Sequence, residues 1–71
     1  MPFIEVTLVE GRSPQQLRAL ISGLTSAAVD AVGAPRDSVR VVLREVPATH
    51  FAAGDVTIAE RNANAETPGR S

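Results

Sequence analysis

Apolar and polar residues alternate at the start of this chain, and the spacing then changes to one apolar residue every three or four positions. The alternation predicts a strand over residues 3–9, with Ile4, Val6 and Leu8 on one face and Phe3 and Val9 among the residues on the other. Apolar residues on both faces are expected where one face meets a helix and the other meets a partner subunit.

The second spacing predicts a helix that begins after a turn at residues 10–12. Ser13 suits the N-cap, Pro14 the first helical position, and Gln16 can complete a capping box. Gly33 suits a left-handed C-cap and Pro35 prevents continuation. One apolar stripe runs along this helix: Leu17, Leu20, Ile21, Leu24, Ala27, Ala28, Ala31 and Val32.

A run rich in β-branched residues predicts a second strand over 39–46, ended by Pro47. A helical crossover between two strands makes them parallel. We expect a loop over 48–54 and a short third strand or ribbon over 55–59. Residues 1–61 then form one domain, and the polar residues 62–71 form a disordered tail.

A β-α-β unit of this size cannot cover its own sheet. Two strands leave two open edges and one bare face, and a pair of strands is unstable alone in water. Assembly through the sheet is therefore expected. The apolar residues that we expect at this contact are Phe3, Val9, Val42 and Val46.

Composition narrows the possible functions. No apolar run approaches the roughly 20 residues of a membrane span, and no leader precedes the first strand, so we expect a cytoplasmic protein without a membrane partner. A net charge of −1 and only two aromatic residues argue against nucleic-acid binding. The chain has no Cys, and all seven cationic residues are Arg, which excludes thiolate and lysine chemistry.

The remaining bases are carboxylates, His50 and an N-terminal amine. If Met1 is removed, Pro2 carries a free secondary amine. An ordinary α-amino group has a pKa of about 7.7–8.0, and nearby cations would lower it, so such an amine can serve as a general base. The alternative is that Pro2 merely starts the strand.

Three other residues have both a chemical and a structural interpretation. Arg12 precedes a helix N-terminus, where guanidinium and backbone amides together suit a carboxylate ligand; otherwise it is a loop arginine neutralised by Glu10. Arg40 lies among valines and is either a substrate ligand or half of an interface salt bridge to Glu5 or Glu45. Phe51 either lines a pocket or caps a core. Two arginines beside an amine suit enolisation of a dicarboxylate.

These residues resemble the 4-oxalocrotonate tautomerase family over about residues 2–61. The matching pieces are Pro2, the stretch Leu8–Ser13, Ala34-Pro35, Ser38–Val41, and His50-Phe51 followed by Gly54. The resemblance implies an α+β fold of tautomerase/MIF-like type. Its subunit is β-α-β, with parallel strands and a short C-terminal hairpin or ribbon, and three dimers form a homohexamer.

The resemblance also implies roles for particular residues. Pro2 would move a proton between the 2-hydroxyl group and a carbon of 2-hydroxymuconate or a similar unsaturated dicarboxylate. Arg12 would hold the distal carboxylate, and Arg40 of a neighbouring subunit the carboxylate and oxygen at the reacting end. Phe51 would form an apolar wall, and the backbone near Leu8 would position the substrate. We expect no cofactor and no metal, and a place in aromatic compound degradation.

The loop after Phe51 departs from the family pattern. Ala52-Ala53-Gly54-Asp55 replaces a glycine-rich stretch, which affects substrate identity more than mechanism. Alternatives therefore stay open: a dehalogenase, hydratase or decarboxylase of the same superfamily, a biosynthetic tautomerase with another substrate, and a non-catalytic oligomeric binding module. Hydration would require a carboxylate such as Asp55 to turn inward.

Overall fold

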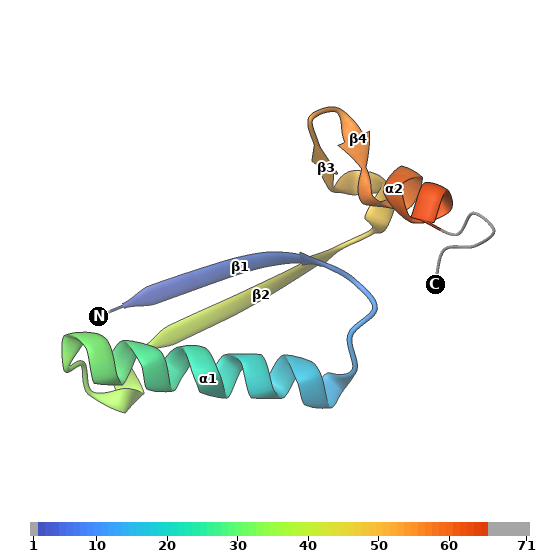
Figure 1. Cartoon of the computed structure of the whole chain (residues 1–71). Coiled ribbons are helices and arrows are strands. Elements are labelled where there is room, and N and C mark those ends of the chain that lie inside the picture. The colour runs from blue at the N-terminus through green and yellow to red at the C-terminus, as the bar shows by residue number, and fades with distance from the viewer. Residues whose placement is uncertain (1, 66–71) are drawn as a thin grey trace.

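The computed structural model describes residues 2–65, which begin with a parallel β-α-β unit (Figure 1). Strand β1 (Phe3–Val9) pairs with β2 (Arg40–Val46), in a register that runs from Phe3 opposite Arg40 to Val9 opposite Val46. Helix α1 (Pro14–Val32) connects them. The parallel arrangement confirms the crossover prediction, and β2 starts one residue later than expected.

Both ends of α1 are fixed by the local signals seen in the sequence. The Ser13 Oγ accepts a hydrogen bond from the Gln16 amide at 3.1 Å, and the Ser13 amide donates to Gln16 Oε1 at 2.9 Å. Gly33 adopts a φ of 69° and donates its amide to the carbonyl of Val29 at 3.0 Å. The predicted capping box and left-handed C-cap are confirmed.

The two faces of the sheet differ in what covers them. Ile4, Val6 and Leu8 are half-buried on the face that α1 covers, while the other face carries no helix (Figure 1). On this helix-free face Phe3 is 67% exposed and Val42 is 39% exposed. Within residues 2–64 no side chain is fully buried, so a single chain has only a partial core.

The segment after β2 contains more regular structure than the sequence predicted. A 3-10 helix (Ala48–His50) is followed by a hairpin of β3 (Ala52–Ala53) and β4 (Val56–Thr57), then by α2 (Ile58–Ala65). The antiparallel hairpin confirms the expected short C-terminal hairpin or ribbon. The expected loop over 48–54 contains a 3-10 helix and β3, and the strand or ribbon expected over 55–59 ends at Thr57, where α2 begins.

Helix α2 begins at a second capping box. The Thr57 amide donates to Glu60 Oε1 at 2.9 Å, and the Glu60 amide donates to Thr57 Oγ1 at 3.1 Å. Because the helix continues to Ala65, residues 62–65 are helical rather than part of a disordered tail. The rest of the predicted tail, residues 66–71, lies outside the described residues.

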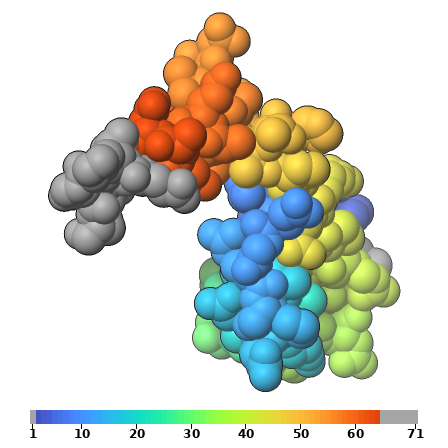
Figure 2. All heavy atoms as spheres, turned by 90° about the vertical axis from the view of Figure 1, so that its right-hand side faces the viewer, coloured from blue at the N-terminus to red at the C-terminus, as the bar shows by residue number. Residues whose placement is uncertain are grey.

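The chain is elongated, because the β3–β4–α2 segment projects beyond the C-terminal ends of β1 and β2 (Figure 1) and stands above the rest of the chain in the space-filling view (Figure 2). The radius of gyration is 16.0 Å, against about 11 Å for a compact domain of this length. An extended chain with a partial core is typical of a subunit that completes its packing in an assembly. No helix in the described range is both long and apolar enough to span a membrane.

Candidate active site

Pro2 and Arg40 are joined at the N-terminal end of the sheet. The backbone amide of Arg40 donates a hydrogen bond of 3.0 Å to the carbonyl oxygen of Pro2, directly before β1 begins. Pro2 is half-buried. The residue proposed as the base is therefore held by the backbone of the residue proposed to bind the reacting end of the substrate.

The Arg40 side chain is exposed on the helix-free face, because residues of a strand alternate between the two faces of a sheet. Its Nη1 donates to the carbonyl oxygen of Asp37 at 2.7 Å. Within the described part of one chain Arg40 forms no salt bridge to Glu5 or Glu45, and Glu5 pairs with Arg44 at 3.0 Å.

Arg12 lies at the opposite end of the sheet. Its Nη1 donates to the carbonyl oxygen of Val9 at 2.8 Å, and the side chain is exposed. Between residues 2 and 65 the Glu5–Arg44 contact is the only ion pair, so Glu10 does not neutralise Arg12 in this arrangement. A strand from Pro2 to Val9 spans about 23 Å, which keeps Arg12 remote from Pro2 within one chain.

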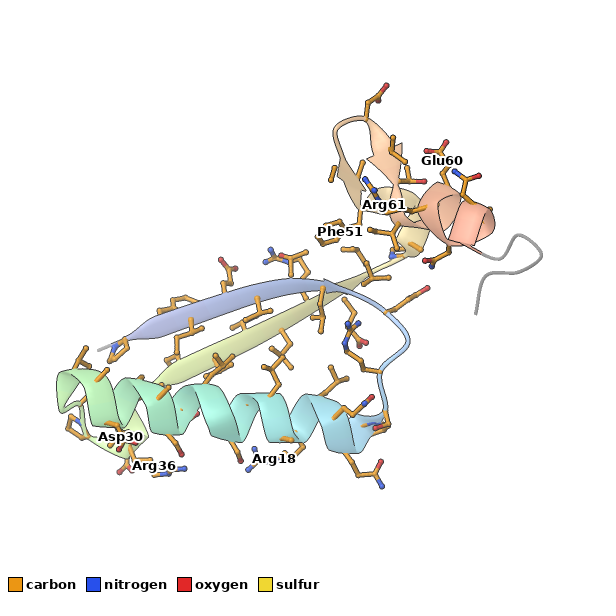
Figure 3. All side chains as sticks on the ribbon, in the orientation of Figure 1. Arg18, Asp30, Arg36, Phe51, Glu60 and Arg61 are labelled. Carbon is orange, nitrogen blue, oxygen red and sulfur yellow. The ribbon has the colours of Figure 1, made fainter. Side chains whose placement is uncertain are left out.

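Phe51 belongs to the projecting C-terminal segment (Figure 3). It follows the 3-10 helix, is half-buried, and accepts a 2.8 Å hydrogen bond at its carbonyl oxygen from the amide of Ile58. Leu8 lies in the same C-terminal half of the sheet, half-buried on the face covered by α1. His50 is exposed beside Phe51, and its backbone amide donates to Pro47 at 2.8 Å.

One chain therefore divides the predicted site residues into two groups. Pro2 and Arg40 occupy one end of the sheet, while Arg12, Leu8 and Phe51 occupy the other end or lie beyond it. The described residues of a single chain form no pocket. Asp55, the carboxylate considered for hydration, is exposed at the tip of the β3–β4 hairpin. A site that brought both groups together would need residues from more than one copy.

The Glu5–Arg44 pair is a feature that the sequence analysis missed. Strand alternation already places Glu5, Arg40 and Arg44 on one face, so the signal was present in the sequence. Only the structure shows which arginine the carboxylate selects, with Glu5 Oε2 at 3.0 Å from Arg44 Nη2.

Comparison with known proteins identifies the class of this chain. The family model described as tautomerase enzyme matches residues 2–61. The chain therefore belongs to the tautomerase family, and it is an isomerase. This confirms the family and the enzyme class that the sequence motifs indicated.

The relatives and the solved structures agree with this assignment. A Ralstonia nicotianae protein named as a probable tautomerase is 55% identical over 56 residues, which are 79% of this chain and 80% of that protein. The 2-hydroxymuconate tautomerase of Comamonas testosteroni is 42% identical over 60 residues, covering 84% of this chain and 95% of the relative.

Among solved structures, TomN is described as a 4-oxalocrotonate tautomerase homologue in the tomaymycin biosynthetic pathway. It is 47% identical, with a TM-score of 0.85 over 87% of this chain and 95% of TomN. A heterohexamer 4-oxalocrotonate tautomerase from Chloroflexus aurantiacus is 38% identical, with a TM-score of 0.82 over 84% of this chain and 97% of that chain. These matches confirm the predicted fold class.

Proposed function

We propose that this tautomerase interconverts the enol and keto forms of 2-hydroxymuconate or a similar unsaturated dicarboxylate, with Pro2 as general base and then general acid. The amine of Pro2, freed by removal of Met1, takes the proton of the 2-hydroxyl group. The same proton returns to a carbon of the conjugated chain, so no other reactant is consumed. The names of relatives such as the Comamonas testosteroni enzyme support this substrate class.

The observation that carries the proposal is the separation of the candidate residues within one chain. Strand β1 pairs only with β2 in the described sheet, so its other edge is open to a second copy. If two copies pair there antiparallel about a twofold axis at Val6, Phe3 of one copy meets Val9 of the other. Pro2 then lies beside Glu10 of that copy, close to its Arg12.

In this assembly the two arginines act on opposite ends of the substrate. Arg12 of the second copy binds the distal carboxylate. Arg40 of a further copy binds the carboxylate and the oxygen at the reacting end, where negative charge develops as the proton leaves. Phe51 forms the apolar wall, and the backbone near Leu8 helps to position the substrate. A homohexamer built as a trimer of dimers supplies all of these groups, and a described heterohexamer among the similar structures supports it.

The test begins with the mass of the intact protein, which reports whether Met1 has been removed. Turnover of 2-hydroxymuconate is then followed by ultraviolet absorbance for the native protein, Pro2→Ala and His50→Gln. We expect Pro2→Ala to lower kcat by about 100-fold or more, the usual size of general acid–base catalysis. His50→Gln, which removes the chain's only imidazole, should retain activity. Equal rates for native protein and Pro2→Ala would exclude a specific need for the secondary amine of Pro2, since alanine also carries a free N-terminal amine. An inactive native protein would exclude this substrate.

The likeness to TomN favours a second candidate, a biosynthetic tautomerase that acts on a different enol acid. The two candidates differ in what they require of Arg12. If the substrate has a single carboxylate at the reacting end, Arg12→Ala should leave kcat/KM nearly unchanged. If the substrate is a dicarboxylate, the same substitution should raise KM because the distal carboxylate loses its ligand.

A further inference from the structure

Glu5 stands between two arginines on the helix-free face of the sheet. In the register it lies opposite Val42, so Arg40 and Arg44 are each two residues away along β2, one on either side. Such diagonal neighbours on one face are within reach of long side chains. Glu5 selects Arg44, with Glu5 Oε2 at 3.0 Å from Arg44 Nη2.

This choice leaves the charge of Arg40 available. The Arg40 guanidinium donates a hydrogen bond from Nη1 to the carbonyl oxygen of Asp37 at 2.7 Å. That oxygen carries no formal charge, so it does not neutralise the guanidinium. A guanidinium has five N–H donors, so most of its binding capacity remains. If Glu5 turned to Arg40, a fixed carboxylate would occupy the place of a substrate carboxylate.

We propose that Arg44 is a positioning residue that holds Glu5 away from Arg40 and so leaves the Arg40 guanidinium open to the substrate. This inference rests on the proposed function, in which Arg40 binds the reacting end of the substrate. Arg44 itself does not touch the substrate.

Because the Glu5–Arg44 pair is exposed, we expect it to affect which charges pair on this face more than it affects folding. The Glu5 and Arg44 side chains are 54% and 56% exposed, and exposed ion pairs add little to folding stability. Their effect on a neighbouring charge persists, because Arg40 is a diagonal neighbour of Glu5 on the same face, and charges closer than the Debye length of about 8 Å are not fully screened. Covering this face by another copy would strengthen that effect by excluding water.

A double-mutant cycle tests the proposal with four proteins: native, Arg44→Gln, Glu5→Gln and the double variant. We expect Arg44→Gln to lower kcat/KM about fivefold, chiefly through a higher KM, as Glu5 becomes a competitor for Arg40. Glu5→Gln and the double variant should stay close to native, since neither has the competing carboxylate. Arg18→Gln removes an exposed arginine that donates to Ser22 on α1, and it controls for the loss of one positive charge.

Rescue by Glu5→Gln separates this role from a structural one. If Arg44 only stabilised the sheet or the assembly, removing Glu5 as well would not restore KM. An unchanged Arg44→Gln enzyme, or a loss that the double variant shares, would overturn the proposal. Sedimentation of each variant establishes that the assemblies compared are of the same size.

The crystal structure of Arg44→Gln gives a readout that needs no activity. We expect a Glu5 carboxylate oxygen within about 4 Å of the Arg40 guanidinium, the range of an ion pair. A Glu5 side chain that keeps its place or turns to solvent would overturn the inference. If the native protein fails to turn over 2-hydroxymuconate, the proposed function fails in the assay, while this structure still decides the inference.

Discussion

The backbone amide of Arg40 donates to the carbonyl oxygen of Pro2 at 3.0 Å, so the two residues meet through their backbones at the N-terminal end of the sheet. Phe3 is opposite Arg40 in the register, so the Arg40 side chain shares the face of Phe3, and Pro2 precedes it by one residue. The two residues are neighbours in the chain fold without sharing a pocket. Because successive residues along a strand face opposite sides of the sheet, we expect a site that uses the Pro2 amine and the Arg40 guanidinium to take them from different copies.

Mixing of inactive variants tests this directly. Copies with Pro2→Ala and copies with Arg40→Gln are unfolded, combined in equal amounts and refolded together. If each site takes Pro2 and Arg40 from different copies, random assembly leaves both residues native in about a quarter of the sites. We expect about that fraction of native activity, against almost none for either variant alone.

The control for this experiment is a mixture that cannot form an intact site. Pro2→Ala copies combined with copies that carry both substitutions contain no native Pro2, so they should stay inactive. If the first mixture also stays inactive although mixed assemblies are detected by mass spectrometry, Pro2 and Arg40 do not meet across copies.

The pH profile tests the protonation state of the base. A general base must be deprotonated in the free enzyme, so kcat/KM should fall as the pH drops through the pKa of the Pro2 amine. The fall should approach tenfold per pH unit on the acid side. A profile that is flat from acidic to neutral pH would contradict an amine base, and a profile unchanged in His50→Gln would show that the imidazole is not responsible.

The sequence predicted those parts of the fold whose signals are local. Helix α1 was delimited correctly because Ser13, Gln16 and Gly33 each act within a few residues of the helix end. Helix α2 was missed although Thr57 and Glu60 have the spacing of a capping box, because residues 55–59 were interpreted as a short strand or ribbon.

The candidate site was less accessible to sequence reasoning than the fold. The residues themselves follow from the family resemblance, but their convergence depends on how copies pack, which no periodicity encodes. Within one chain the distance along β1 separates Pro2 from Arg12, and Phe51 lies on a segment that projects from the sheet (Figures 1 and 3). The partner chosen by Glu5 likewise depends on side-chain geometry across the two strands.

The turn between β3 and β4 gives a stability prediction, in which Gly54 of the turn is compared with Gly23 of α1. Gly54 and Asp55 have φ values of 60° and 70°, as a two-residue turn of type I′ requires. Gly54→Ala should lower the free energy of unfolding by about 1 kcal/mol, because an alanine Cβ is unfavourable in the left-handed region. Open space around Gly54 excludes a clash with more distant residues as the cause, so the local backbone conformation alone sets the cost.

Gly23 is the matched control, since it also has open space where a Cβ would lie but sits in α1 without a positive φ. Gly23→Ala should raise the free energy of unfolding by about 0.5–1 kcal/mol through helix propensity. Thermal denaturation at one fixed protein concentration compares both variants, because assembly makes the melting temperature depend on concentration. Effects of the same sign would contradict the assignment of the turn.

The helix-free face gives the last prediction, which concerns assembly. Phe3 is 67% exposed there and Val42 is 39% exposed, so association of copies through this face would bury both. Phe3→Glu places a charge without a partner in that contact, and burying such a charge is costly. We therefore expect smaller species in sedimentation velocity, with weaker tautomerase activity at low protein concentration. Ser22→Glu adds the same charge to the exposed surface of α1 and should leave the assembly unchanged. If Phe3→Glu sediments like the native protein, this face is not the contact, and the open edge of β1 alone would have to hold the copies together.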